Sequence, residues 1–115
     1  MRRTLGFSAL LLAAPAAVLA HHGWGSYDAS KTVVIEGPIQ TSSYSNPHAT
    51  ITVKAPEKTW TVTLAPVSRM QARGAPADFV AVGRMVKAEG YASKVDPSEM
   101  RAERITVDGK TVEMR

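Results

Sequence analysis

Apolar residues alternate with threonines along the middle of the chain. Ile51 and Val53 begin the pattern, and Trp60, Val62 and Leu64 repeat it a few residues later. Because successive side chains of a strand point to opposite faces, the alternation predicts two strands, each with one apolar face and one threonine face. The Pro-Glu-Lys tripeptide between them predicts a turn. We therefore expect an antiparallel pair whose apolar face, Trp60 included, lies in one core.

The flanking segments predict further strands and one helix. We expect a long strand over 31–44, a helix of about two turns over 66–73, and strands over 84–92, 100–107 and 110–114. Gly37-Pro38 lies within the first strand and requires a bend, a bulge or an edge, because proline cannot donate to a ladder. The apolar phase slips between Ala102 and Ile105, which predicts a bulge. An Asp-Gly pair just before residue 110 predicts a tight hairpin.

This order of elements indicates a fold class. The chain has three strands, a short helix, and then two or three more strands. A long, bent first strand and a helix between strands 3 and 4 are typical of an OB-type barrel. We expect a mainly β protein, a small OB-like antiparallel barrel of five to six strands with that one short helix. An open meander with the helix plugging one side is the alternative.

The first twenty residues predict an export signal. Two arginines precede an apolar run, and an alanine-rich stretch ends at Val18-Leu19-Ala20. This order is typical of a secretory signal peptide cleaved after Ala20, with Ala16 or Ala17 as the alternative cleavage point. The run is shorter than the roughly 20 residues that a spanning helix needs. We expect residues 1–20 to be removed and residues 21–115 to form a single OB-like domain in the periplasm, with no membrane span.

Composition excludes several functions. Removing Arg2 and Arg3 lowers the basic residues from 14 to 12 against 10 acidic ones, so the formal charge falls from +4 to +2. This near balance and the export signal disfavour a nucleic-acid partner. The chain has no cysteine, which excludes thiolate catalysis and thiolate metal sites. No Ser-His-Asp set, phosphate-binding loop or paired acids stand out, so we do not expect an enzyme.

The three histidines of the chain, His21, His22 and His48, are the candidate metal ligands. Cleavage after Ala20 would give His21 a free α-amine beside its own imidazole, so that one residue offers two nitrogen ligands. With the imidazole of His48 as the third ligand, they would form a T-shaped histidine brace, a tetragonal nitrogen site that favours copper(II). His22 is the alternative third ligand. Binding should weaken at low pH, because the amine and the imidazoles must be deprotonated.

The same histidines also have an ordinary structural interpretation. His21 and His22 can belong to a solvated arm. His48 follows Asn46-Pro47, a turn signal, and can be a turn residue that bonds the backbone.

Other side chains are weaker candidates. We expect the methionines to pack in the core rather than to form a copper(I) site, and the scattered acids to be surface charges; these are Met70, Met85, Met100 and Met114, and Asp28, Glu36, Asp96 and Glu99. Trp24 is expected to hold the amino-terminal arm against the barrel, or else to form part of a ligand platform. A cluster of Arg69, Arg73 and Arg84 would make a basic patch, although a solvated helix face explains them equally well.

Several segments resemble a family of small exported bacterial proteins catalogued as a domain of unknown function. These segments lie at 21–28, 45–51, 60–66, 69–74 and 99–105. Their most specific parts are the His-His start of the first segment and Asn46-Pro47-His48 in the second. The resemblance covers essentially the whole expected mature chain. The resemblance implies that the protein is exported and that these histidines act together. It implies no particular activity.

Two functions fit these observations. The first is a periplasmic metal-binding protein, most readily for copper(II), that buffers the ion or delivers it to a periplasmic partner protein. The alternative is a non-metal binding module that recognises a small ligand or a partner protein through the loops of the barrel.

Overall fold

The computed structural model of the protein describes residues 23–115. The expected signal peptide, its cleavage point, His21 and His22 lie outside the described residues.

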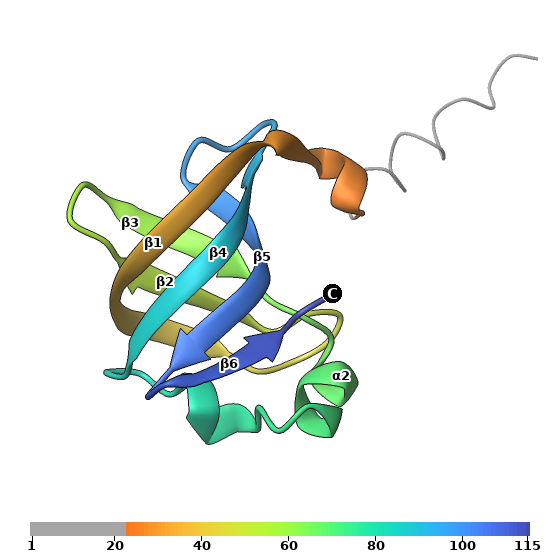
Figure 1. The fold of residues 1–115 in the computed structure, drawn as a ribbon, viewed down its shortest axis with the longest axis vertical. Helices are drawn as coiled ribbons and strands as arrows, with labels where there is room; N and C mark the ends of the chain where they lie inside the picture. Colours follow the sequence, from red (N-terminus) through yellow and green to blue (C-terminus); the bar gives the residue numbers. More distant parts are fainter. Residues whose placement is uncertain (1–22) are drawn as a thin grey trace, which may run out of the picture.

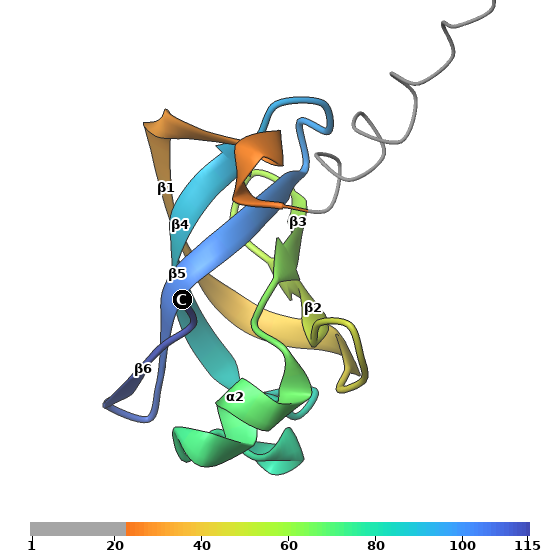
Figure 2. The same cartoon turned by 90° about the vertical axis from the view of Figure 1, so that its right-hand side faces the viewer.

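Six strands form one sheet that closes into a barrel (Figure 1). In chain order the elements are η1 (Trp24–Ser26), β1 (Tyr27–Ser43), β2 (Thr50–Lys54), β3 (Thr59–Thr63), α2 (Val67–Ala72), η2 (Ala77–Val80), β4 (Met85–Ser93), β5 (Glu99–Val107) and β6 (Lys110–Glu113). The sheet order is β3-β2-β1-β4-β5-β6, and a short parallel pairing of β3 with β5 closes the ring. The prediction of a mainly β, OB-like barrel with a short helix between strands 3 and 4 is confirmed. The α2 helix lies at one end of the barrel and the η1 turn near the other (Figure 2).

The first strand, β1, pairs with two other strands. β1 pairs with β4 as far as Pro38 and with β2 from Ile39 onward, with a register shift just after Ile39. A Cβ atom at Gly37 would overlap the carbonyl oxygen of Lys54, so the change of partner needs glycine there. The bend predicted at Gly37-Pro38 is confirmed. β1 begins at Tyr27, earlier than expected, because its first residues pair with the end of β4 without any apolar alternation that would reveal a strand.

The core is built from the predicted apolar faces. Ile51, Val53, Val62 and Leu64 are each at most 1% exposed. Trp60 shares their face but is only half-buried, with the Lys58 Nζ atom 4.4 Å from its ring centroid. Trp60 therefore packs against the core as expected but is not enclosed by it, since it lies near the start of β3, beside the hairpin turn.

Three of the four methionines expected in the core are there. Met70, Met100 and Met114 are at most 2% exposed, whereas Met85 is 59% exposed. Met85 opens β4 and precedes Val86, which points inward, so the alternation of the strand turns Met85 outward.

The α2 helix is tied to the carboxyl end of the chain. Pro66 is its N-cap rather than its first helical residue, and Met70 is its buried contact. Arg69 donates to the Met114 carbonyl (3.0 Å), and Arg73 donates to that of Arg115 (2.8 Å). Arg84 instead pairs with Asp108. The three arginines therefore do not form one patch.

A bulge in β5 brings that strand close to β4. Gly90 pairs with Ala102 and Glu89 with Arg104, which leaves Glu103 as the extra residue and confirms the predicted bulge. A Cβ atom at Gly90 would overlap the carbonyl oxygen of Arg101 and lie 2.8 Å from the Ala102 Cα atom. Gly90 therefore sets the close approach of the backbone from which Arg101 projects.

We predict that Gly90→Ala lowers the free energy of unfolding by about 1–3 kcal/mol, because the added methyl group forces β4 and β5 apart. Urea denaturation measures the change. Gly25→Ala is the matched control, since its added Cβ atom meets nothing within 4 Å. Equal effects of the two substitutions would contradict the role given to Gly90.

Candidate functional site

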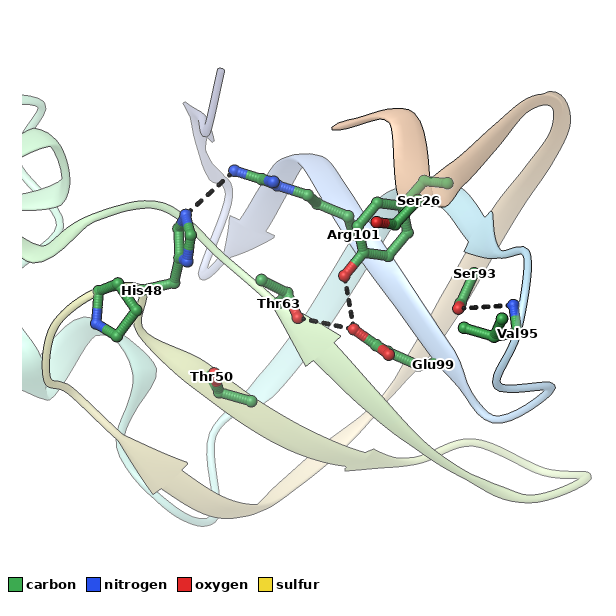
Figure 3. A pocket seen from close by; sticks show the side chains of 10 residues that line it. Ser26, His48, Thr50, Thr63, Ser93, Val95, Glu99 and Arg101 are labelled. Atoms are coloured by element: carbon green, nitrogen blue, oxygen red, sulfur yellow. Dashed lines mark hydrogen bonds between the residues drawn. The ribbon is translucent and has the colours of Figure 1, made fainter. Parts of the chain in front are cut away.

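A polar cavity of about 230 Å³ lies in the wall of the barrel, under the amino-terminal arm (Figure 3). The arm, the loop before β2, strands β2 and β3, and the β4–β5 loop with the start of β5 all contribute to it. The lining residues are Ser26, Tyr27, Pro47, His48, Thr50, Thr63, Ser93, Val95, Glu99 and Arg101. The cavity combines a cation, a carboxylate, an imidazole and several hydroxyl groups, which makes it the candidate functional site.

Arg101 is the central side chain of this site. The residue is only 6% exposed, and its guanidinium carbon lies 4.2 Å from the ring centroid of Trp24 and 6.0 Å from that of Tyr27. Its Nη2 atom donates to Nε2 of His48 (3.2 Å), whereas its buried Nε atom has no hydrogen-bond partner among the described residues. Arg101 therefore links the arm, through Trp24, to the loop that carries His48.

The charge of Arg101 is incompletely compensated by these contacts. Burial lowers the pKa of the Arg101 guanidinium, and the positive charges of Arg69 and Arg115 lower it further, while Tyr27 opposes them. Taking a cation out of water costs several kcal/mol, and a desolvated cation–π contact contributes about 2 kcal/mol. Arginine nevertheless stays protonated in proteins. The site thus holds a positive charge that the aromatic rings offset only in part.

A hydrogen-bonded carboxylate, that of Glu99, lines the cavity two residues before Arg101 on the same strand. Oε2 of Glu99 accepts from the Tyr27 hydroxyl (2.5 Å) and from Oγ1 of Thr63 (3.1 Å), as Figure 3 shows. Burial and the bond to Glu99 raise the pKa of the Tyr27 phenol. Tyr27 is therefore a neutral donor at physiological pH, and Glu99 is not the ordinary surface charge that we expected.

His48 is half-buried on the loop that leads into β2. Backbone bonds between Ala49 and the segment after β3 fix this loop: Ala49 donates to Ala65 (2.9 Å) and accepts from Leu64 (2.8 Å). Because a guanidinium can only donate, the Nε2 atom of His48 is the acceptor in its bond with Arg101. The turn that was predicted for Asn46-Pro47 thus presents His48 to the cavity.

Within residues 23–115, no three His, Cys, Asp or Glu side chains gather in a way that could hold a metal ion. Of the three predicted ligands, the structure describes His48, and His21 and His22 lie outside its range. A metal site at His48 would therefore need ligands from the residues before Gly23.

Trp24 fastens the arm at the mouth of the cavity. Its ring makes edge contacts with Tyr27 and Tyr91 (centroids 6.4 and 6.2 Å apart) and lies 4.2 Å from the guanidinium carbons of both Arg101 and Arg115. The expectation that Trp24 holds the arm against the barrel agrees with these contacts. The arm is fixed up to one residue after His22.

Sequence reasoning missed Arg101 and misjudged Glu99. The two residues flank the inward-pointing Met100, so alternation along β5 would assign both to the solvent face. Arg101 is buried because the arm returns across that face. The sequence did contain a signal. Glu99 and Arg101 are opposite charges two residues apart on one predicted strand, and the segment before the first strand is rich in aromatic residues.

A second groove, of about 530 Å³, runs between β1 and the β2–β3 hairpin. Its lining is mostly apolar and includes Val33, Val34 and Trp60, and Glu36 and Glu57 also line it. It lacks the mixture of charged and hydrogen-bonding groups found in the first cavity.

The fold and this cavity define a small OB-like barrel protein with a polar site beneath its amino-terminal arm. Residues 9–100 match the family of unknown function DUF6152, and the chain belongs to that family. No curated protein matches the chain.

Solved structures with a similar fold include two larger chains. The ZRD-deleted mutant of TiaS, crystallised in complex with agmatine, is 14% identical with a TM-score of 0.56 over 76% of this chain. The S. pombe Stn1-Ten1 complex is 15% identical with a TM-score of 0.54 over 67% of this chain. The protein spans only 27% and 57% of those chains. At such identities the likeness concerns the fold alone.

Among the described residues, none of the helices is both long enough and apolar enough to cross a membrane.

We predict that Tyr27→Phe lowers the free energy of unfolding at neutral pH by about 1 kcal/mol, because the Glu99 carboxylate loses a donor. The pKa of the phenol is raised by folding, so its contribution is present below the unfolded pKa near 10 and is lost as the pH rises through the folded value. Denaturation at pH 7 and pH 11 tests this. Tyr91→Phe removes a phenol on the neighbouring strand as a control. A Tyr27→Phe effect that stays constant up to pH 11 would contradict the account.

Proposed function

We propose that the mature protein binds copper(II) in the periplasm through an amino-terminal histidine brace, and that it buffers the ion or passes it to a partner protein. The α-amine and imidazole of His21 supply two nitrogen ligands, and the imidazole of His48 supplies the third. The observation that carries the proposal is the position of the arm, which is fixed beside the cavity that His48 lines.

A short path of contacts supports this pairing. Trp24 stacks on Arg101, and Arg101 donates to His48. His22 lies two residues before Trp24, and consecutive Cα atoms are about 3.8 Å apart. The brace therefore requires that the residues just before Gly23 reach the cavity that His48 lines.

The chemistry of the donors also favours copper(II). An amine and imidazoles are the nitrogen ligands that suit a tetragonal site. Tyr27 keeps its proton at neutral pH because its pKa is raised, so it does not offer a phenolate. If copper binds through Nε2 of His48, the Arg101 donor must turn away from that atom.

The size of the cavity supports binding rather than catalysis. A volume of about 230 Å³ accommodates a metal ion and a few small ligands. Drug-sized ligands occupy pockets of roughly 300–1,000 Å³. Buffering or delivery is the role that this space suits.

We predict that two different changes each weaken copper(II) binding by at least about tenfold. His48→Ala removes an imidazole ligand. One glycine added before His21 keeps every side chain but displaces the α-amine from the His21 imidazole. Isothermal titration of protein whose mass confirms a start at His21 measures both effects.

The controls separate a brace from ordinary histidine binding. Gln71→Ala, an exposed substitution on α2, should leave the affinity unchanged. His22→Ala reports whether His22 replaces His48 as the third ligand. An unchanged affinity after the glycine extension would end the brace proposal, and binding weaker than about micromolar in the native protein would favour the non-metal module.

We also predict that the copper affinity falls by at least about tenfold between pH 7 and pH 6, because protons compete for the amine and the imidazoles. A competition assay with a chelator of known pH dependence measures this change. An affinity that does not depend on pH would exclude the amine as a ligand.

A further inference from the structure

We propose that Arg101 forms a binding site for a small monocarboxylate in the cavity beneath the arm. The inference goes beyond copper binding, and metal-free protein can test it. It rests on a buried cation that lines a cavity of suitable size and that forms no ion pair with any of residues 23–115.

The first observation is that the charge of Arg101 is unpaired. Ion pairs between described residues engage Arg84, Arg104 and Arg115, and none includes Arg101. The Nε atom of Arg101 also has no hydrogen-bond partner there. An arginine that is only 6% exposed ordinarily has a carboxylate opposite it, whereas the described acceptor of Arg101 is the neutral ring nitrogen of His48.

The second observation is the positive potential around this residue. Arg69 and Arg115 both act on Arg101 as like charges. Arg115 is partly compensated by Glu103 (3.2 Å), and Arg69 donates to a backbone carbonyl, which leaves its charge in place. A bound anion would be attracted by all three cations.

The third observation is the carboxylate of Glu99, which lies two residues before Arg101 on the same strand. Glu99 lines the same cavity and accepts from Tyr27 and Thr63, so its carboxylate already has donors of its own. Its charge repels every anion in the cavity, and it repels dicarboxylates and the phosphate dianion more strongly than a monocarboxylate. A single carboxylate can approach Arg101 while the remainder of the ligand faces the hydroxyl groups of Thr50 and Thr63.

The geometry of the groups favours a carboxylate over other anions. A guanidinium presents parallel N–H groups that match the two oxygens of a carboxylate. The terminal Nη1 and Nη2 groups of a guanidinium form such a pair, and in Arg101 Nη2 also donates to His48. A cavity of about 230 Å³ limits the ligand to a short chain.

Propionate is the probe. The chain has two tryptophans, so in a Trp60→Phe background the fluorescence of Trp24 reports directly on its stack with Arg101. Mature, chelator-treated protein is titrated with sodium propionate at constant ionic strength. We expect a saturable change with a dissociation constant of about 1 mM, in keeping with so small a ligand, and no change with the neutral isostere propionamide.

Two variants test the assignment to Arg101. Arg101→Lys keeps the charge but removes the fork, and it should weaken propionate binding by about tenfold. Arg115→Gln lowers the local potential and should weaken binding a few-fold; because it also removes a cation from the Trp24 ring, its affinity is measured by calorimetry. Arg104→Gln is its control, because Arg104 also forms a surface ion pair (with Glu113, 2.9 Å) but is not among the charges that act on Arg101, and the propionate affinity of this variant should be unchanged. Urea denaturation establishes that each variant is folded.

The proposal is overturned if propionate produces no saturable change, if propionamide produces the same change, or if inorganic phosphate binds as tightly. It is also overturned if folded Arg101→Lys and Arg115→Gln both bind propionate like the parent protein. Because no metal is present, these outcomes are independent of whether the protein binds copper.

Discussion

The stack of the Arg101 guanidinium on the Trp24 ring joins the amino-terminal arm to the barrel. Arg101 projects from β5 just before the bulge, at the point where Gly90 allows β4 to approach closely. Its Nη2 atom reaches His48 on the loop before β2. One buried cation therefore connects three parts of the chain that are distant in sequence, and the cavity lies where they meet. Contacts of Trp24 with Tyr91 and Arg115 also help to hold the arm in this position.

The barrel itself could be predicted from the sequence. Threonine alternation identified β2 and β3, Gly37-Pro38 indicated the bend of β1, and the phase slip after Ala102 indicated the bulge of β5. These signals are local, since each depends on a few neighbouring residues. The exposure of Met85 follows from the alternation of β4 and could have been predicted. The half-burial of Trp60 could not, because it depends on the position of Trp60 at the end of the barrel beside the hairpin turn.

The site was less predictable for a physical reason. His48 was recognised because histidine is rare in the chain and follows a turn signal. Arg101 was missed because strand alternation assigns it to solvent, whereas the returning arm buries it. Glu99 was assigned to the surface because the phenol that holds it, Tyr27, is 72 residues away in sequence. Contacts of this kind arise from tertiary structure and produce no periodic pattern in the sequence.

The two proposed sites share the contact between His48 and Arg101, so they are expected to be coupled. Copper bound at His48 would lie beside a buried positive charge, and Coulomb repulsion would oppose it. A carboxylate on Arg101 would offset that charge and so favour the metal. By linkage, copper would increase the affinity for the carboxylate by the same factor. On this account, the cavity is suited to an ion and its counter-ion together.

The most direct test of the central claim, that the arm and His48 form one copper site, is electron paramagnetic resonance of the mature protein with one equivalent of copper(II). The account predicts a tetragonal spectrum with coupling to several nitrogens. When His48 is replaced by alanine, the coupling of one imidazole nitrogen should disappear while that of the amine remains. A spectrum dominated by oxygen ligands, or one that His48→Ala does not change, would contradict the account.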